Sequence, residues 1–153
     1  MKQLDPIPSP QSALCLRLMR VCSELSAAGD ACLSGTGLNQ TRFAILYHLA
    51  QAPEGLNPKE LAVRLAVPRA TMTGLLDGLE KEGHTERGPD PSDRRALRVR
   101  LTTSGTKFVK ATVPSHCRRL SRIMEALSEK ERVLLGTVLD KIETAVDSME
   151  GQP

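Results

Sequence analysis

Two adjacent arginines, Arg94 and Arg95, are the side chains whose type and setting most clearly suggest a chemical role. They follow the run Asp90-Pro91-Ser92-Asp93, whose composition is typical of a turn. The next segment alternates between apolar and basic residues, which predicts a half-buried strand with a basic solvent face. Its apolar positions are Leu97, Val99 and Leu101, and its basic positions are Arg98 and Arg100. Residues 84–101 therefore predict a β-hairpin with two guanidinium groups at its exposed tip.

The charge around this hairpin predicts a polyanionic partner. Between Arg94 and Arg122 the sequence has nine basic residues and no acidic one, whereas from Ile123 onward seven acids accompany three bases. The net charge of +3 conceals this asymmetry. Solvated helix and strand faces would explain some of these arginines, but a basic stripe is also the electrostatic footprint of phosphate binding. We interpret the stripe as a contact with nucleic acid.

Composition narrows the class of partner and the compartment. One Tyr, two Phe and no Trp among 153 residues leave little for base stacking, so duplex DNA is favoured over single strands or RNA. A chain of this length predicts one domain, residues 1–153, without room for a catalytic domain, and hence no enzyme.

Short apolar runs predict no membrane contact, and Pro6, Pro8 and Pro10 interrupt any signal peptide, so we expect a cytoplasmic protein. The four cysteines and three histidines show no metal-like spacing, so we expect reduced thiols, no metal and no cofactor.

Helical periodicity assigns most of the remaining sequence, and the expected fold class is mainly α with a small β-hairpin wing. Helices predicted over 12–32 and 128–149 carry apolar residues at alternating spacings of four and three, which is typical of faces that pack on another helix. These residues are Leu14, Leu18, Val21, Leu25 and Ala28, and Leu135, Leu139, Ile142, Val146 and Met149. One compact lobe cannot easily bury both stripes, so we expect them to build a homodimer. A connecting helix over 105–125 contains Pro114, which should kink or divide it.

The segment 38–104 has the pattern of a winged helix-turn-helix. Asn39 is a good N-cap, and Asn57-Pro58-Lys59-Glu60 is a strong helix start with a cap, a first-turn proline and a capping-box glutamate. A turn then leads to a helix over 69–82, which presents Arg69, Thr71 and Thr73 outward and ends at Gly83. Such a helix pair followed by a basic hairpin predicts one element for the major groove of DNA and one for the minor groove.

These residues resemble the MarR family of bacterial winged-helix transcriptional regulators over roughly residues 14–148. The matching stretches are Leu56–Ala62, Ala70–Gly83, Asp90–Ala96 and Val99–Gly105. The Asp-Arg-Arg wing, followed by a strand and a Leu-Thr-x-x-Gly helix start, is the most distinctive part. The resemblance implies a ligand- or stress-responsive regulator, usually a repressor, that acts as a homodimer through N- and C-terminal dimerisation helices.

The resemblance also implies roles for individual residues. Arg94 would enter the minor groove and Asp93 would brace the wing. The full set of expected DNA contacts is Asn57, Lys59, Arg69, Thr71, Thr73, Gly74, Asp93, Arg94 and Arg95. Two departures bear on operator choice, since Pro68 stands where a capping hydroxyl is common and Gly74 where many relatives carry an arginine. Gly74 and Gly78 either allow close helix packing or, at Gly74, admit the DNA close to the helix backbone.

Two mechanisms of regulation remain open: binding of a small ligand and oxidation of a thiol. Relatives commonly bind small aromatic or lipophilic acids between the dimer helices and the winged helix, and some sense peroxide with an early cysteine. The expected effector contacts are Arg17, Arg20, Tyr47, His48 and Arg118, and the expected sensor is Cys15. The alternatives are that the arginines are solvated, that His48 is a satisfied core residue, and that Cys15 is a small buried hydrophobe.

Two functions fit the whole sequence. The first is a sequence-specific repressor that is released from a pseudo-palindromic operator by a ligand or by oxidation. The second is an architectural protein that binds duplex DNA without operator choice. Equal affinity for random duplexes would favour the second function.

Overall fold

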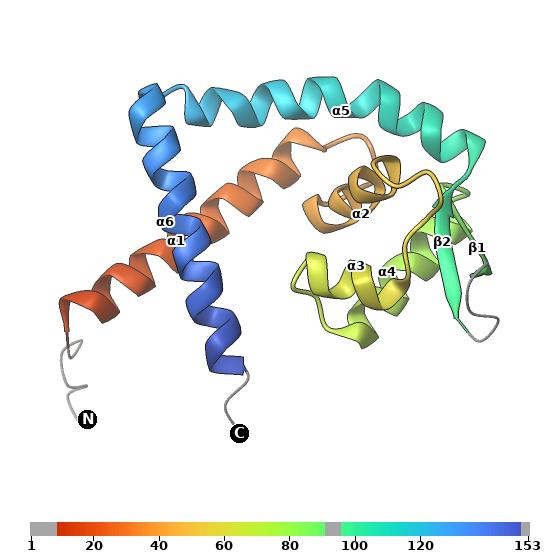
Figure 1. Cartoon of the computed structure of the whole chain (residues 1–153). Helices are drawn as coiled ribbons and strands as arrows, with labels where there is room; N and C mark the ends of the chain where they lie inside the picture. The colour runs from red at the N-terminus through yellow and green to blue at the C-terminus, as the bar shows by residue number, and fades with distance from the viewer. Residues whose placement is uncertain (1–8, 91–95, 151–153) are drawn as a thin grey trace, which may run out of the picture. The chain divides into compact units, whose positions relative to one another are not determined.

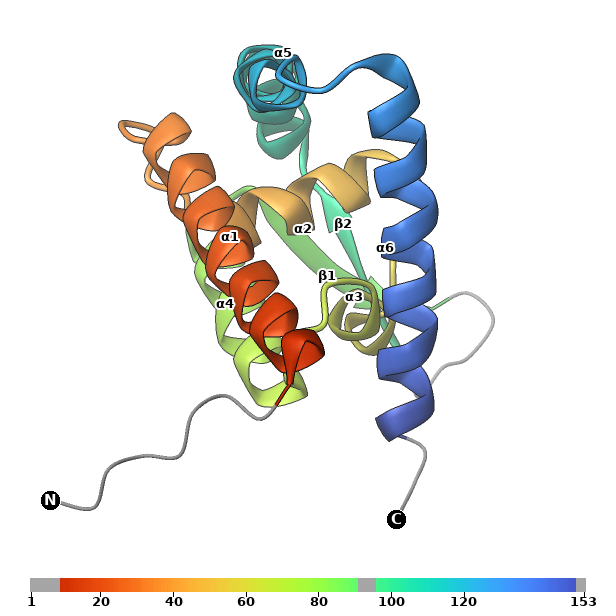
Figure 2. The ribbon, with the colours of Figure 1, turned by 90° about the vertical axis from the view of Figure 1, so that its left-hand side faces the viewer.

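The computed structural model describes residues 9–90 and 96–150, and it contains two compact units, Met1–His116 and Cys117–Pro153. The first unit holds α1 (Pro10–Cys32), α2 (Gln40–Ala50), α3 (Pro58–Arg64), α4 (Arg69–Lys81), β1 (Thr85–Pro89), β2 (Leu97–Leu101) and the start of α5 (Thr103–Met124). The second unit holds the rest of α5 and α6 (Glu129–Glu150). Within the first unit, the hairpin lies beside α2, α3 and α4 (Figure 1, Figure 2). The predicted fold class, mainly α with a small hairpin, is confirmed.

Side-chain caps explain where the helices begin. Helix α1 starts two residues before the predicted position because the Ser9 hydroxyl accepts the Ser12 N–H at 3.1 Å and Pro10 suits the first helical position. The predicted cap at Asn39 is confirmed, since its side-chain oxygen accepts the Arg42 N–H at 2.9 Å. At α5, the Thr102 hydroxyl accepts the Gly105 N–H at 2.9 Å.

Helix α6 begins with the predicted capping box. The Ser128 N–H and hydroxyl both donate to Glu131 Oε2, at 2.8 and 2.7 Å. These bonds stabilise the ionised carboxylate and lower the pKa of Glu131 below its ordinary 4.5, the side-chain bond being the larger cause. The contribution of this cap to stability is therefore complete above pH 4.5 and is lost as the pH falls through the lowered pKa.

The core of the first unit lies between β2 and the helices α2, α3 and α4. Ile45, Leu61, Leu79 and Val99 are each 0% exposed, so α2, α3, α4 and β2 all contribute to one apolar cluster. The hairpin is antiparallel and pairs Thr85 with Leu101 and Pro89 with Leu97. Leu56 extends it, because Leu56 and Val99 exchange two backbone hydrogen bonds of 3.0 and 2.9 Å. The segment before α3 is thus bonded directly to the wing.

A tight junction joins α4, the hairpin and α5. Gly83 ends α4 with φ +74°, a conformation that favours glycine, as predicted for this position. The His84 carbonyl then accepts the Thr102 N–H at 3.1 Å, and a Cβ at Gly105 would overlap that same oxygen. Helix α5 therefore starts in contact with the backbone that begins the wing.

Two expectations about the longer helices have different outcomes. Pro114 was expected to kink or divide the connecting helix, and it does not divide it, because α5 runs unbroken from Thr103 to Met124; the kink stays a prediction. The predicted apolar stripes of α1 and α6 lie largely at the surface of the single chain, with Leu14 66% and Met149 74% exposed. Among residues 9–90 and 96–150, no helix is long and apolar enough to cross a membrane.

Candidate nucleic-acid interface

A groove of about 350 Å³ brings together residues from α3, α4 and the base of the wing. Its lining residues are Asn57, Pro58, Lys59, Arg69, Met72, Thr73, Ala96 and Leu97. Four of the nine expected DNA contacts thus line one surface of the first unit. Met72 and Leu97 were not among the expected contacts, and Leu97 was expected on the apolar face of the strand.

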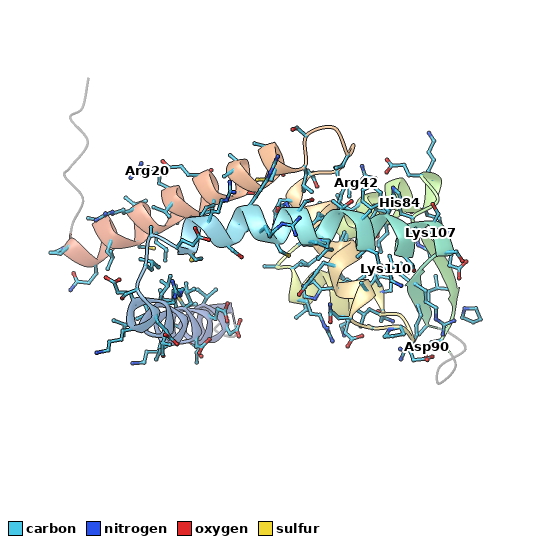
Figure 3. The ribbon with its side chains drawn as sticks, turned by 90° about the horizontal axis from the view of Figure 1, so that it is seen from above. Arg20, Arg42, His84, Asp90, Lys107 and Lys110 are labelled. Carbon is cyan, nitrogen blue, oxygen red and sulfur yellow. The ribbon has the colours of Figure 1, made fainter. Side chains whose placement is uncertain are left out.

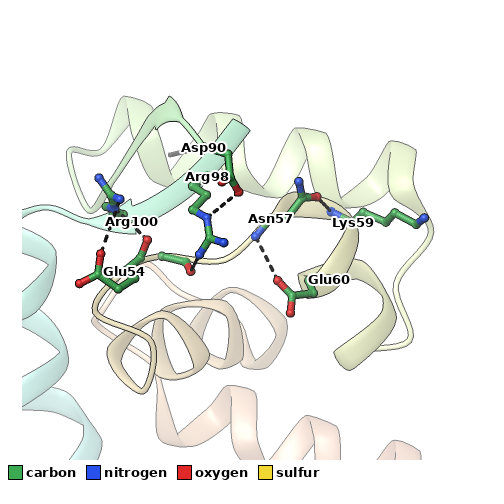
Figure 4. A network of polar contacts seen from close by, with 8 residues as sticks. Glu54, Asn57, Lys59, Glu60, Asp90, Arg98 and Arg100 are labelled. Atoms are coloured by element: carbon green, nitrogen blue, oxygen red, sulfur yellow. Dashed lines mark hydrogen bonds and ion pairs between the residues drawn. The ribbon is translucent and has the colours of Figure 1, made fainter. Parts of the chain in front are cut away.

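The start of α3 orients Lys59. The Asn57 side-chain oxygen accepts the Lys59 N–H at 2.8 Å, and the Asn57 N–H donates to Glu60 Oε2 at 3.4 Å (Figure 4). The predicted capping box is confirmed. Asn57 therefore has a structural role at the helix start, whereas the exposed Lys59 ammonium makes no hydrogen bond or ion pair within the described part of the chain. It is available to a phosphate.

The start of α4 exposes backbone and side-chain donors. Pro68 is the N-cap and forms no side-chain cap bond, as predicted, so the first N–H groups of α4 keep their partial positive charge. Arg69, Thr71 and Thr73 are exposed. The Thr73 hydroxyl donates to the Arg69 carbonyl at 3.1 Å and can still accept a hydrogen bond. No partner of the Arg69 guanidinium is found among the residues that the structure describes.

Gly74 lies on the same exposed face of α4. A Cβ at this position would meet nothing within 4 Å, so close helix packing does not explain this glycine. Gly78 lies one turn further along α4. A Cβ at Gly78 would be 3.7 Å from the Arg42 guanidinium, so this position is partly covered. The open surface at Gly74 agrees with the other explanation, in which DNA approaches the helix backbone closely.

The tip of the wing, with Asp93, Arg94 and Arg95, lies outside the described residues. Its base is described. On β1, the Arg87 guanidinium bonds Asp77 at 2.6 Å and Glu80 at 3.1 Å, which ties this strand to α4.

The second strand is tied to the turn before α3. Arg98 Nε donates to Asp90 Oδ2 at 2.6 Å, and Arg98 Nη1 donates to the Gly55 carbonyl at 3.1 Å (Figure 4). Arg100 Nε donates to the Glu54 carbonyl at 2.9 Å. The Asp90 side chain is only 8% exposed, which makes the bond from Arg98 the more enclosed of the two contacts.

Two expectations for β2 need correction. Arg98 and Arg100 do not form a free basic face, because the turn between α2 and α3 lies alongside the strand and both guanidinium groups bond it. Leu97 is not buried but 51% exposed, because it stands at the end of the strand, where the groove opens. Sequence alternation predicted the two faces of the strand, but it could not predict what covers each face.

The residues expected at an effector site lie on different elements. Arg17 and Arg20 are exposed on α1, and Arg20 pairs with Glu24 at 2.7 Å. On α2 the rings of Tyr47 and His48 meet edge to face, with centroids 6.0 Å apart. Arg118 is exposed in the second unit.

The candidate sensor thiol is accessible. Cys15 is a free and exposed cysteine in the single chain, so the alternative that it is a small buried hydrophobe does not hold there. No cluster of three or more His, Cys, Asp or Glu residues that could hold a metal ion occurs in the ranges 9–90 and 96–150.

Comparisons with known proteins agree with this geometry. A model of the MarR family matches residues 36–96. The transcriptional repressor YetL of Bacillus subtilis is 32% identical over 139 residues, which cover 88% of this chain and 83% of YetL. The transcriptional repressor MprA of Escherichia coli is 33% identical over 142 residues, which cover 92% and 81%. A mutant of E. coli MarR complexed with operator DNA has a TM-score of 0.77 and 26% identity, with coverage of 85% and 93%.

The fold and the groove define a winged helix-turn-helix protein. Together with the identities to YetL and MprA, they show that the chain belongs to the MarR family. It is a transcriptional regulator of that family.

Proposed function

We propose that this chain is a repressor that binds operator DNA as a homodimer, with α4 in the major groove and the wing in the adjacent minor groove. The observation that carries the proposal is the groove in which the exposed starts of α3 and α4 meet the base of the wing. Lys59 and Arg69 supply cations for phosphates, and Thr71 and Thr73 supply small polar groups for base edges. Repressor function in YetL and MprA and the operator bound to MarR support this function.

The proposed contacts divide into three roles. Lys59, Arg69 and the N-terminus of α4 position the protein on phosphates, while Asn57 holds the start of α3 in place. Thr71, Thr73 and Gly74 face the bases of the major groove. Arg94 enters the minor groove, where groove width adds sequence preference, with Arg95 at a phosphate and Asp93 bracing the loop.

A homodimer accounts for the exposed apolar stripes of α1 and α6. Leu14 and Met149 each leave more than half of their surface uncovered in the single chain. A two-fold contact that uses both helices would bury the stripes and unite residues 1–153 in one dimeric domain. Two copies of α4 would then read half-sites about 10 bp apart or a multiple of this spacing, on DNA in the cytoplasm.

Operator binding is tested by fluorescence anisotropy with the intergenic DNA that flanks the gene. Wild type should bind this DNA far more tightly than a scrambled duplex, and Arg94→Ala and Arg69→Gln should each weaken the binding. Lys141→Gln on α6 removes one positive charge outside the groove and serves as the control. Equal affinity for the flanking and scrambled duplexes would support the architectural alternative instead.

We further propose that the repressor is released by a small apolar acid or by oxidation of Cys15. The candidate ligand contacts in the first unit are Arg17, Arg20, Tyr47 and His48. A ligand can release DNA only if it binds the non-binding conformation more tightly. Release by peroxide that persists in Cys15→Ser would exclude this thiol, and release by acids that persists in Tyr47→Ala and His48→Ala would exclude the ligand site.

A further inference from the structure

A single arginine joins three segments of the first unit. Arg42 belongs to the first turn of α2, and its Nη2 is 2.5 Å from Glu82 Oε2 at the end of α4. Its Nη1 donates to the Gly37 carbonyl, in the loop that follows α1, at 3.2 Å. Arg42 does not line the DNA groove, and in Figure 3 it lies well apart from Asp90 at the base of the wing.

Neither charge of this ion pair stabilises its own helix. A helix dipole favours anions near the N-terminus and cations near the C-terminus. Arg42 is a cation in the first turn of α2, and Glu82 is an anion at the C-cap of α4, so each stands at the less favourable end. Local helix chemistry therefore does not explain these two residues, whereas the ion pair between them does.

The guanidinium is more enclosed than in an ordinary surface pair. The Arg42 side chain is 16% exposed, against 66% for the arginine of the exposed pair on α1. It lies over Gly78 in the last turns of α4, where a Cβ would come within 3.7 Å of Nη2. The Arg42 Nε is buried and has no hydrogen-bond partner within residues 9–90 and 96–150. An unpaired buried donor costs stability, so the contacts of the two other nitrogens hold the side chain in this place.

The loop beside Arg42 also fixes α2 to the end of α1. The Gln40 N–H, the first of α2, donates to Asp30 Oδ1 at 2.5 Å. Leu33 and Leu38, at the two ends of the loop, are 1% and 8% exposed and belong to the core. The end of α1 and the start of α2 are thus connected, and Arg42 extends this connection to the end of α4.

We infer that Arg42 is a positioning residue for operator binding, which sets the place of α4 relative to α1 through Glu82. The inference rests on the proposed operator binding by a homodimer that uses α1. In such a dimer, the position of α4 relative to α1 determines how far apart the two copies of α4 lie, and therefore which spacing of half-sites fits. Arg42 thus acts on the preferred spacing without touching DNA.

Arg42→Met tests this role, because it keeps an unbranched stem and removes the guanidinium. Anisotropy compares the operator found in the flanking intergenic DNA with a version that has one base pair inserted between the half-sites. The insertion moves one half-site by about 3.4 Å and rotates it by about 34°. Arg42→Met should bind the natural operator about two- to thirtyfold more weakly than wild type, the range for residues that alter coupling without contacting a ligand.

The insertion itself should cost Arg42→Met less affinity than it costs wild type, because α4 is less tightly placed. This comparison separates positioning from a general loss of folded protein, which would weaken binding to both operators by the same factor. The slope of affinity against salt should stay that of wild type, whereas loss of a phosphate contact would reduce it by about 1.

Two further variants identify the ion pair as the cause. Glu82→Gln should reduce the spacing preference in the same way, and the double variant should lose no more than Arg42→Met alone, because both changes remove one contact. Lys81→Met is the matched control, since Lys81 is exposed beside Glu82 on α4 and takes no part in the contact.

An unchanged spacing preference in Arg42→Met, an equal effect of Lys81→Met, or a salt slope reduced by about 1 would overturn the inference. Wild type that binds the flanking DNA no better than a scrambled duplex would refute the proposed function instead. Amide hydrogen exchange in the DNA-free protein then tests the contact by itself. Faster exchange in the last turn of α4 in Arg42→Met, and not in Lys81→Met, would support its role in holding α4, and equal exchange would exclude that role.

Discussion

Replacing Arg98 by methionine tests whether the ion pair at the base of the hairpin holds the wing. Methionine keeps an unbranched stem and removes the guanidinium, which bonds Asp90 at 2.6 Å and the Gly55 carbonyl at 3.1 Å. Arg100→Met is the matched control on the same face of the same strand. Its guanidinium bonds Glu54, whose side chain is 88% exposed.

The magnitude follows from the burial of each partner. Removing one partner of a fully buried ion pair costs about 3–5 kcal/mol, because the other charge stays buried. The Asp90 side chain is 8% exposed, but water reaches the 29% exposed Arg98; we therefore expect Arg98→Met to lower the free energy of unfolding by about 2 kcal/mol. Arg100→Met should lower it by about 0.5–1 kcal/mol, as for an exposed contact.

Thermal unfolding at one fixed protein concentration measures this difference, since the stability of the proposed dimer would depend on concentration. For a chain of this size we expect Arg98→Met to melt about 2–6 °C below Arg100→Met. Operator affinity should also fall more for Arg98→Met, because the wing loses its bond to the turn before α3. Equal melting temperatures and equal operator affinities of the two variants would refute the reasoning.

Three further predictions test the groove, the α5 junction and the α6 cap. Lys59→Gln should weaken binding to all duplexes alike and reduce the slope of affinity against salt by about 1, measured by anisotropy at several salt concentrations; an unchanged slope would exclude a phosphate contact. Gly105→Ala should destabilise the fold by about 1–3 kcal/mol because its Cβ would overlap a backbone carbonyl, whereas Gly74→Ala, which has open space, should keep or raise the melting temperature. Ser128→Ala should raise the pKa of Glu131 toward 4.5 and make stability less dependent on acidic pH, followed by NMR titration; an unmoved pKa would contradict the assigned cause.

Local chemistry explains why much of the fold could be predicted from the sequence. A cap acts over two or three residues, so Asn39, Asn57 and Ser128 mark their helix starts with no information about distant contacts. Periodicity likewise places Leu61 and Leu79 in the core. The predicted start at residue 12 is two residues late, because the Ser9 side chain caps α1 and Pro10 occupies its first position.

The candidate site could be predicted in part for the same reason. Arg69, Thr71 and Thr73 are exposed at the start of α4, as the helical pattern required. By contrast, the prediction that β2 has a free basic face is wrong, because Arg98 and Arg100 bond a turn more than 40 positions away in the sequence. No local pattern could indicate that pairing.

The sequence alone determined the helix-turn-helix, the hairpin and the apolar stripes, because propensity, capping and periodicity act within a few residues. Only the tertiary structure decided that Leu97 opens into the groove, that Arg98 bonds the enclosed Asp90, and that Arg42 bonds Glu82 on another helix. Each of these depends on which distant segment covers a given face. The covering segment is determined by the packing of the whole unit. Val99, for example, is buried in the core and also pairs its backbone with Leu56, 43 positions earlier in the sequence.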